Sequence, residues 1–525
     1  MDTRRPCGAV TGTGSARGAA CLLSAALLLS ACAQLPPPFP HTVSTASPTW
    51  EGTAWGQVAR RSLPADSASG FQLMPIASVA YGARLELAEK AQQTLDVQYY
   101  VLAQDGTGKR FIRALRDAAR RGVRVRLLVD DVYTAGEDGM LAELAAEPHA
   151  EVRVYNLFPA ARDSSAGRWL ASWWDFRRVD HRMHNKLFVV DNALAVFGGR
   201  NIADPYFMRG ADSNFVDLDV LAAGPVVREL SRAFDEYWDS DFVYPIETFA
   251  HRDPRPGNAI ADDADPSPVP DAPRTELRQR YSGTVRQLAE GRVRLEEAGA
   301  TVVFDPPDKT AGSRDLSREG TVRGDLSLVI RSAREEVVVA SPYFVPGQEG
   351  MAAIRALRAR GVKLRLLTNS LAATDEPFVH VGYARYREAM VRLGVDVREI
   401  GPGLVREHSR FGSFGRSLGR LHAQVAVIDR RIVFIGSMNF DPRSERRNTE
   451  IGVLMESPEL ARQVLELMDV DQTSYHVRLA ADGESLEWAY IRDGHETVWT
   501  DEPEASLGRR VQVRFWWPFV PEGEL

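Results

Sequence analysis

The sequence predicts an α/β fold made of two similar halves, each a mixed sheet flanked by helices, related by a pseudo-twofold axis. Apolar runs typical of strands alternate with amphipathic stretches typical of helices along most of the 525 residues. Two separate segments recur in the second half, displaced by 238 or 239 residues, which indicates an internal duplication. Hydrophobic residues make up 44% and charged residues 26%, which excludes a disordered, collagen-like or polytopic membrane protein.

The N-terminus has the pattern of a targeting signal. Residues 1–17 carry three arginines against one acid, and the apolar run that follows has about 14 residues, fewer than the ~20 of a spanning helix. Leu29-Ser30-Ala31-Cys32 resembles a bacterial lipobox, which implies a lipoprotein signal peptide over 1–31 and a lipid anchor on Cys32. A plain signal peptide with a chance cysteine is the alternative. Ala33 favours the outer over the inner membrane of a bacterial cell envelope.

Two segments poor in large apolar residues divide the remaining chain. We expect residues 32–60 to form a tether, since Pro, Ser and Thr are abundant there. Residues 252–274 are rich in Pro, Asp and Ala and are predicted to be an exposed linker, with an ordered surface loop as the alternative. The first domain then covers 61–251 and the second 275–525. All three cysteines lie within the first 32 residues, so neither domain can form an internal disulfide or a cysteine-ligated metal site.

Corresponding elements follow one another in the same order in both halves. The apolar runs that begin at Leu95 and Val337 predict strands. Each precedes an IRALR stretch with helical periodicity, a glycine turn (Gly122 or Gly361) and a second buried strand. We therefore expect amphipathic helices to cover a sheet in each half.

The second repeated segment carries the polar residues of interest. It reads His184-x-Lys186-x4-Asp191 and His422-x-Gln424-x4-Asp429, followed by Gly198-Gly199-x-Asn201 and Gly436-Ser437-x-Asn439 respectively. Residues i and i+2 of a strand point to one face, so each histidine projects together with the residue two positions later. The apolar runs 187–190 and 425–428 predict strands that are buried on both faces.

This set of residues suits the cleavage of a phosphodiester. A neutral imidazole can attack phosphorus, and a protonated imidazole can give its proton to the leaving alkoxide. Lysine, asparagine and backbone amides can stabilise the anionic oxygens. We expect the substrate phosphate to be bound by Gly199, Asn201, Ser437 and Asn439. The chemistry needs neither a metal ion nor an organic cofactor, and none is predicted.

The two motifs resemble the HKD motif of the phospholipase D superfamily. The resemblance covers nearly all of residues 70–525 and implies two phospholipase D-like domains that form one active site between them. It implies His184 as the nucleophile and His422 as the general acid and later the base, although the residues leave the reverse assignment open. Lys186 and Gln424 then belong to the catalytic set.

Four carboxylates complete the predicted site. Asp217 and Glu450 occupy matching places after the two motifs, and we expect them to orient the histidines and tune their pKa values. Exposed carboxylates on a strand are the alternative for this pair. Asp191 and Asp429 belong to the motif but are predicted to be structural, accepting hydrogen bonds from backbone near a turn.

Gln424 departs from the family, which has lysine at this position. Glutamine keeps two N–H donors but loses the charge, a difference of about 1 kcal/mol, or about fivefold to tenfold in rate. We therefore expect weakened catalysis with both histidines retained. The segment 403–420 carries arginines that could supply the missing charge, with a solvated basic loop as the alternative; they are Arg406, Arg410, Arg416 and Arg420.

Three segments narrow the resemblance to bacterial C-type cardiolipin synthases: residues 198–202, Ser341-Pro342-Tyr343-Phe344 and residues 439–444. This implies a membrane-associated phosphatidyltransferase that passes a phosphatidyl group through a phosphatidyl-histidine to phosphatidylglycerol, with phosphatidylethanolamine as a second candidate substrate. With water as acceptor the protein would be a phospholipase D or another phosphodiesterase, such as an exported nuclease. The net charge of −7 argues against nucleic acid. A third alternative is a weakly active or inactive lipid-binding lipoprotein, because of Gln424.

Aromatic residues cluster at two places outside the motifs. One cluster contains Trp169, Trp173, Trp174 and Phe176, and the other lies in residues 514–520. Such rings suit membrane interfaces. Burial in the core is the alternative for the first cluster. For the second we expect packing against the body, with a membrane-facing surface as the alternative.

Overall fold

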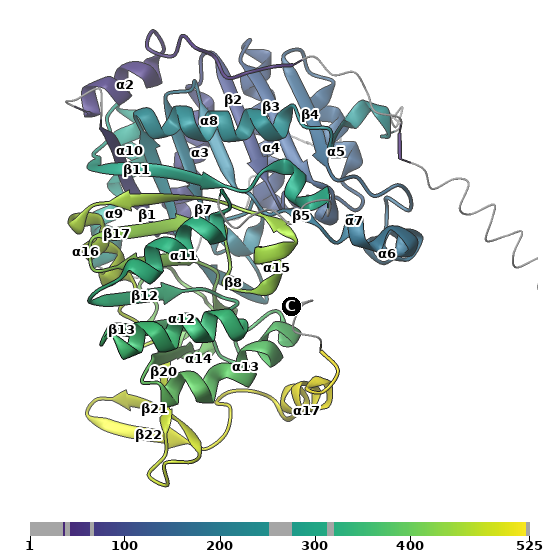
Figure 1. The fold of residues 1–525 in the computed structure, drawn as a ribbon. Coiled ribbons are helices and arrows are strands. Elements are labelled where there is room, and N and C mark those ends of the chain that lie inside the picture. The colour runs from purple at the N-terminus through teal and green to yellow at the C-terminus, as the bar shows by residue number, and fades with distance from the viewer. Residues whose placement is uncertain (1–34, 37–42, 64–67, 251–275, 312–319, 521–525) are drawn as a thin grey trace, which may run out of the picture.

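The computed structural model describes residues 35–36, 43–63, 68–250, 276–311 and 320–520 (Figure 1). The predicted signal peptide, Cys32 and the 252–274 linker lie outside the described residues. The described chain forms two α/β halves stacked on each other, with the first half in purple to teal and the second in green to yellow.

The first half contains an eight-stranded mixed sheet in which β2, β3 and β4 run parallel. Across the sheet the strands are β1 (Ser69–Met74), β9 (Asp219–Ala223), β7 (Leu194–Gly198), β6 (Leu187–Val190), β2 (Thr94–Tyr99), β3 (Arg124–Asp130), β4 (Ala150–Tyr155) and β10 (Val243–Pro245).

The second half repeats this order. Its strands are β11 (Glu296–Phe304), β19 (Ile451–Glu456), β17 (Ile432–Gly436), β16 (Gln424–Ile428), β12 (Glu336–Ala340), β13 (Lys363–Asn369), β14 (Asp396–Ile400) and β20 (Ser474–Leu479), extended by β21 (Leu486–Arg492) and β22 (His495–Trp499). The predicted α/β fold of two similar halves is confirmed. Strand β11 also joins the sheets, because Ala298 pairs with Ser69 of β1 while Gly299 pairs with Glu456 of β19.

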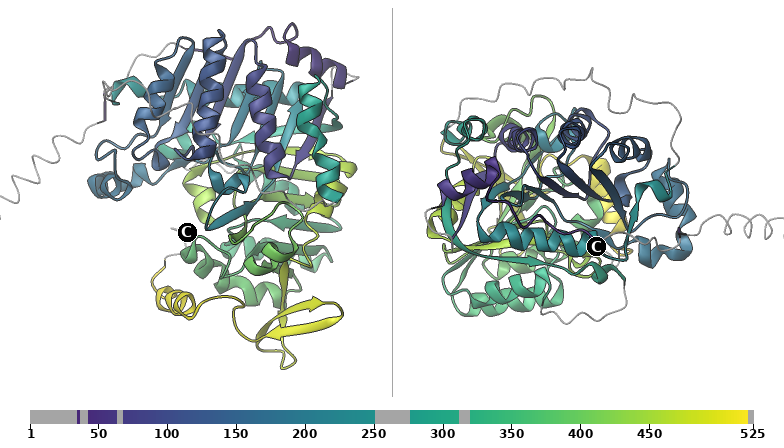
Figure 2. Two further views of the ribbon diagram at one scale, coloured as in Figure 1. Left: turned by 180° about the vertical axis from the view of Figure 1, so that it is seen from behind. Right: turned by 90° about the horizontal axis from the view of Figure 1, so that it is seen from above.

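Helices cover the outer faces, as the periodicity predicts. The first half has α3 (Ala77–Glu89), α4 (Gly106–Arg120) and α5 (Asp138–Ala145) on one face and α8 (Pro225–Trp238) on the other (Figure 2). The second half has α11 (Val322–Ser332), α12 (Gly347–Ala359), α13 (Pro377–Arg392) and α16 (Pro458–Leu467). The predicted glycine turns follow α4 and α12, with φ of +95° at Gly122 and +81° at Gly361. These left-handed values favour glycine, because a Cβ would clash with the following carbonyl.

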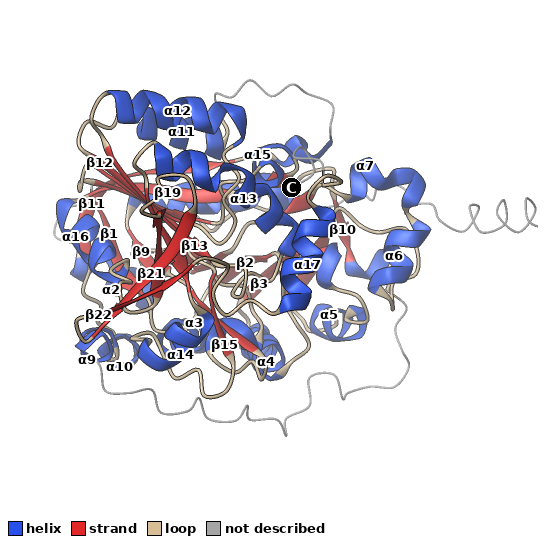
Figure 3. Cartoon of the chain, turned by 90° about the horizontal axis from the view of Figure 1, so that it is seen from below, coloured by secondary structure: helices blue, strands red, loops and turns tan. Residues whose placement is uncertain are grey.

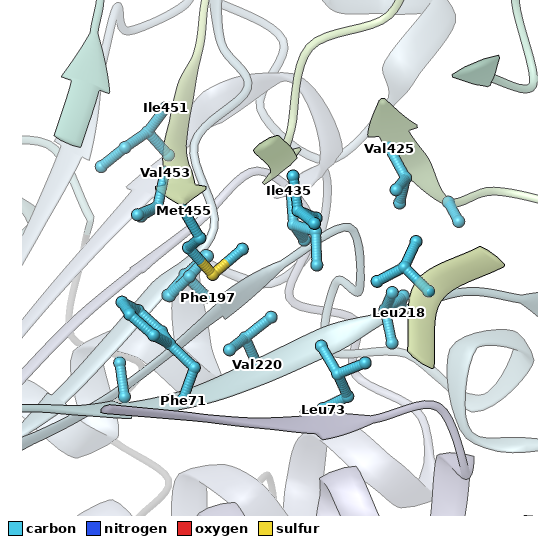
Figure 4. Close-up of a cluster of buried hydrophobic side chains, with 14 of the residues drawn as sticks. Phe71, Leu73, Phe197, Leu218, Val220, Val425, Ile435, Ile451, Val453 and Met455 are labelled. Atoms are coloured by element: carbon cyan, nitrogen blue, oxygen red, sulfur yellow. The ribbon is translucent and has the colours of Figure 1, made fainter. Parts of the chain in front are cut away.

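A single core spans the boundary between the halves. Phe197 and Val220 of the first sheet belong to the same buried cluster as Ile435, Val453 and Met455 of the second (Figure 4). Each such side chain contributes roughly 1.5–3 kcal/mol when fully buried. Each half therefore contributes side chains to a core that stabilises the other half, in addition to the backbone pairing through β11.

The body of the protein begins before residue 61. Helix α2 (Ala54–Ser62) packs on the first half through Trp55, which is buried in its outer core. The backbone N–H of Ala46 donates to Asp235 Oδ2 at 2.9 Å. The tether predicted over 32–60 is thus packed on the domain from residue 43 onward. Helix α9 (Glu276–Tyr281) contacts α16 of the second half, where Arg280 Nη1 lies 2.8 Å from Glu466 Oε2. Helix α10 (Gly283–Ala289) returns to the first half, where Thr284 Oγ1 accepts from Gln72 Nε2 at 3.0 Å.

One buried ion pair distinguishes the two halves. Arg84 Nη1 of α3 lies 2.8 Å from Asp219 Oδ2 of β9, Arg200 Nη1 lies 3.5 Å from the same oxygen, and all three side chains are almost completely buried. At the equivalent places in the second half stand Leu326, Gly452 and Met438. The same framework therefore accommodates either an ion pair or an uncharged pair at this point.

Candidate active site

Two short parallel ribbons cross from one half to the other and position the motif histidines. Strand β5 (Arg182–Met183) pairs with β18 (Asn448–Thr449), and β15 (Leu418–Leu421) pairs with β8 (Ser213–Val216). Each ribbon places a histidine from one half beside a carboxylate from the other, because both lie at or just beyond the ends of the paired strands.

The first histidine site joins His184 and Glu450. His184 Nδ1 lies 2.9 Å from Glu450 Oε2, and the His184 backbone N–H donates to Thr449 O at 2.9 Å. The Ser437 hydroxyl donates to the same Oε2 at 2.5 Å. Since a carboxylate only accepts, we assign the proton to Nδ1, which leaves the Nε2 lone pair for substrate.

The second histidine site repeats the first with the roles of the two halves exchanged. His422 Nδ1 lies 2.8 Å from Asp217 Oδ2, and the His422 backbone N–H donates to Val216 O at 2.8 Å. Gly199 is packed against this pair: a Cβ there would lie 2.2 Å from Asp217 Oδ1 and 2.6 Å from Gln424 Oε1. Only glycine therefore fits at this position without displacing the orienting carboxylate.

Burial dominates the electrostatics around the first histidine. Burial, followed by the charges of Lys186 and His422, holds the pKa of His184 well below its usual 6.5. Burial also lowers the pKa of Lys186 to about 7 and raises that of Glu450 to about 7, while the attraction between these two groups acts in the opposite direction. His184 is consequently held in the neutral form that a nucleophile requires.

Lys186 lies beside the first histidine. The spacing predicts a strand here, whereas residues 184–186 stand between β5 and β6 and not within a strand. Its Nζ donates to His184 O at 2.6 Å and lies 5.3 Å from the centre of the Tyr100 ring. Gln424 occupies the matching place in the second half, where its Nε2 donates to Asn439 Oδ1 at 3.3 Å. Its Oε1 is buried without a hydrogen-bond partner among the described residues. The two halves therefore differ in charge next to the two histidines.

The groups predicted to bind phosphate are engaged with neighbouring protein groups. Asn201 accepts from Val101 N at 3.1 Å and donates to the Tyr206 hydroxyl at 2.9 Å. Ser437 is bound to Glu450, and Asn439 accepts from Gln424. In this structure these contacts position the site, and direct phosphate binding by Gly199, Asn201, Ser437 and Asn439 stays a prediction.

The two motif aspartates lie outside the cluster of histidines. Asp191 accepts backbone N–H groups of Gln92, Gln93 and Thr94, and Asp429 accepts those of Arg334, Glu335 and Glu336. Each thus ties the turn after the motif strand to the start of a neighbouring strand, the kind of contact expected of them.

The arginines considered as substitutes for a lysine at 424 are dispersed. Arg410 donates to the carbonyls of Glu466 and Asp469, whereas Arg406 and Arg416 are exposed. Arg420 lies in β15, two residues before His422. A contribution of Arg420 to the charge of the site stays a prediction.

Aromatic rings and one arginine complete the site, and sequence reasoning did not assign them. Tyr100 packs edge-on against His184 with ring centres 4.8 Å apart, and Tyr206 does so against His422 at 5.0 Å. Arg443 is held by Asp180 Oδ1 at 2.9 Å and contributes to lowering the pKa of His184. Tyr100 lies in the apolar run that begins at Leu95, directly after β2, and Arg443 lies in the 439–444 segment, so the sequence placed both close to the motifs.

The chemistry available follows from this geometry. Two imidazoles each have Nδ1 bound to a buried carboxylate, which leaves Nε2 for a substrate, and the charge of one acts on the other. One can attack while the other transfers a proton. Among the described residues there is no group of three or more His, Cys, Asp or Glu that could hold a metal ion.

Comparison with known proteins agrees with the motifs. The family model described as "Cardiolipin synthase, PLD-like domain" matches residues 85–238 and 326–471. The chain is 38% identical to cardiolipin synthase C of Escherichia coli K12 over 445 residues, which is 83% of this chain and 92% of that protein. It is 30% identical over 448 residues to an uncharacterised protein of Helicobacter pylori 26695, covering 84% and 86% of the two chains.

A solved structure shares the fold. The crystal structure of phosphatidylserine synthase from Haemophilus influenzae Rd KW20 aligns with a TM-score of 0.55 at 12% identity, over 89% of this chain and 99% of that one. The duplicated fold, both motifs and the identity over most of the chain lead to one conclusion. The chain belongs to the phospholipase D-like cardiolipin synthase family and is an enzyme of the phospholipase D superfamily.

Proposed function

We propose that the chain is a membrane-associated phosphatidyltransferase that forms cardiolipin by way of a covalent phosphatidyl-histidine. The observation that carries the proposal is the pair of crossed histidine–carboxylate contacts, His184 with Glu450 and His422 with Asp217. A single histidine–carboxylate pair could serve many reactions, whereas two facing pairs suit a displacement that occurs twice at one phosphorus.

In the first step His184 Nε2 attacks phosphorus, and the bond from phosphorus to the oxygen of the headgroup alcohol, glycerol or ethanolamine, breaks. Protonated His422 gives its Nε2 proton to that oxygen, so the leaving group departs as a neutral alcohol. The low pKa of His184 supports its assignment as nucleophile, because its lone pair is available at neutral pH. Lys186 lies where it can stabilise charge on the phosphoryl oxygens.

In the second step His422 takes the proton of the acceptor hydroxyl. The acceptor oxygen attacks phosphorus, and the phosphorus–nitrogen bond to His184 breaks. With phosphatidylglycerol as acceptor the product is cardiolipin, and with water it is phosphatidic acid. The donor is a phospholipid, with phosphatidylglycerol and phosphatidylethanolamine as the candidates, and the predicted anchor on Cys32 would hold the enzyme on the outer membrane.

Product analysis tests the proposal. The full chain is incubated with EDTA on vesicles of phosphatidylglycerol and phosphatidylethanolamine, beside a His184→Ala control, and the lipids are identified by mass spectrometry. We expect cardiolipin only with the unchanged protein. Phosphatidic acid alone would assign a hydrolase, and equal product from the His184→Ala control would refute the covalent mechanism.

A further inference from the structure

Helix α17 (Leu507–Trp516) buries Val513 in the core of the second half but turns three other apolar side chains outward. Leu507, Val511 and Phe515 follow one another at every fourth position, and their side chains are 77%, 57% and 62% exposed. The helix is held to the body by Arg509, which donates to the carbonyls of Leu371 and Ala372 at 3.1 and 2.8 Å. A surface helix ordinarily buries its apolar stripe, whereas this one leaves it uncovered by the residues that the structure describes.

A segment of the first half shows the same inversion. It comprises α6 (Ser165–Ala171), η2 (Trp173–Asp175) and α7 (Phe176–Val179). Arg168 is 1% exposed and donates to the Arg162 carbonyl, whereas Leu170 and Trp173 are 76% and 72% exposed. Trp174 and Phe176 are about half exposed, so burial of this aromatic cluster in the core does not hold for three of its four rings.

We call the first surface the α17 patch and the second the α6–α7 patch. The α17 patch consists of Leu507, Val511, Phe515, Trp516, Trp517 and Phe519, and the α6–α7 patch of Leu170, Trp173, Trp174 and Phe176. Together they contain most of the large apolar side chains that are exposed among the described residues.

Both patches are attached to segments that border the active site. The chain leaves α7 at Asp180, which binds Arg443, and reaches His184 four residues later. Arg509 of helix α17 donates to the Thr374 carbonyl, in the loop that continues into Asp375. The charge of Asp375 acts on the hydroxyl of Tyr206, which lies beside His422. The helices that carry the patches, α6, α7 and α17, lie toward the same side of the molecule in Figures 1 and 3.

We propose that the two patches together form one docking surface for an anionic phospholipid bilayer, and that this surface holds the mouth of the active site against the headgroups. The phospholipid partner rests on the proposed function. The charges fit it: α17 carries three arginines and no acidic residue, and α7 carries Arg177 and Arg178. Arg509 is bound to carbonyls, Arg510 lies 2.6 Å from Asp501 and Arg178 lies 2.6 Å from Asp175, so Arg514 and Arg177 are the cations that we assign to the headgroups. Exposed Trp, Phe and Leu flanked by arginine is the composition of helices that lie in the membrane interface.

The proposed docking surface does not involve a membrane-spanning helix. Within the described ranges no helix is both long enough and apolar enough to cross a bilayer. The patches would instead enter only the interfacial layer, one from each half, which would fix the orientation of the protein as well as its distance from the lipid. A lipid anchor alone would leave that orientation free.

The test measures vesicle binding without turnover. The full chain carries Cys32→Ser, so that no anchor contributes, and His184→Ala, so that no lipid is consumed. Co-sedimentation with vesicles of phosphatidylglycerol and phosphatidylethanolamine is compared for Leu507→Ser with Phe515→Ser and for Trp173→Ser with Trp174→Ser. The matched control is Ile491→Ser with Val498→Ser, two exposed apolar residues on the β21–β22 hairpin.

We expect each patch variant to weaken vesicle binding at least tenfold, with the control changed less than twofold and all melting temperatures unchanged. Unchanged binding by both patch variants would overturn the proposal. So would a dimer in sedimentation velocity that the patch variants convert to a monomer while vesicle binding persists, since the patches would then be an interface between copies. The patch variants could lose vesicle binding while the protein with His184 intact makes no lipid product. That result would refute the proposed function and leave this proposal standing.

Discussion

Converting each orienting carboxylate to its amide should separate the roles of the two histidines. In Glu450→Gln the amide can present N–H to His184 Nδ1, now 2.9 Å from Oε2, and so moves the imidazole proton to Nε2. A nucleophile without its lone pair cannot attack. The loss expected from a wrong tautomer is about 10⁴-fold, or about 5.4 kcal/mol in the barrier at 1.36 kcal/mol for each factor of ten.

Asp217→Asn acts on His422, whose Nδ1 lies 2.8 Å from Asp217 Oδ2. His422 transfers protons, a contribution of about 10²-fold to 10⁴-fold. If the leaving group needs no proton, the first step no longer depends on proton transfer from His422. A p-nitrophenyl ester of phosphatidic acid has such a leaving group.

The assay is therefore a stopped-flow measurement of p-nitrophenolate release. We expect Asp217→Asn to release one equivalent at a rate within tenfold of the unchanged protein and then to stall, because removal of the phosphatidyl group still needs His422 as base. Glu450→Gln should show no burst. The control is Glu456→Gln, on the same strand β19 but on the surface, and it should behave as the unchanged protein. A burst in Glu450→Gln with none in Asp217→Asn would reverse the assignment of the histidines.

Three further predictions follow from charges in the structure. Gln424→Lys restores a cation beside His422 and should raise kcat on lipid vesicles about fivefold to tenfold; an unchanged or lower kcat would show that the neutral side chain is adapted to this site. Because the pKa of Lys186 is lowered to about 7, raising the pH above 7 removes its charge, and kcat should fall. Lys186→Arg should flatten that alkaline limb in a pH–rate profile, since arginine stays protonated, and an identical limb would exclude Lys186 as its cause. In urea unfolding, Asp219→Ala should cost about 3–5 kcal/mol by leaving Arg84 and Arg200 buried without their carboxylate. The triple change Arg84→Leu, Asp219→Gly and Arg200→Met, which copies the second half at these positions, should cost less than Asp219→Ala.

Much of the fold was predictable because its signals are local. Strand and helix periodicities, the glycine turns and the spacing of the two motifs are set by a few consecutive residues, and their repetition at a near-constant offset revealed the duplication. The duplication also implies that the strands have the same order in both sheets, because similar sequences adopt similar folds. The packing of residues 43–60 on the first half was not predictable, because its Pro, Ser and Thr content is equally compatible with a tether.

The crossed pairing in the active site depends on tertiary structure. His184 and Glu450 are 266 residues apart, and His422 and Asp217 are 205 apart. Matching positions in the sequence showed that Asp217 and Glu450 were equivalent, but not that each serves the histidine of the other half. The ribbons β5–β18 and β8–β15 impose that exchange by running between the halves.

By itself the sequence determined the α/β duplication, the two histidines, and the loss of a lysine at position 424. Only the tertiary structure decided which carboxylate holds which histidine, that Tyr100 and Arg443 join the first of them, and that α17 turns three of its apolar side chains to the outside. The reason is physical. Periodicity is a property of neighbouring residues, whereas burial, the electrostatic surroundings of a buried group and the face that a helix presents are set by segments hundreds of residues apart.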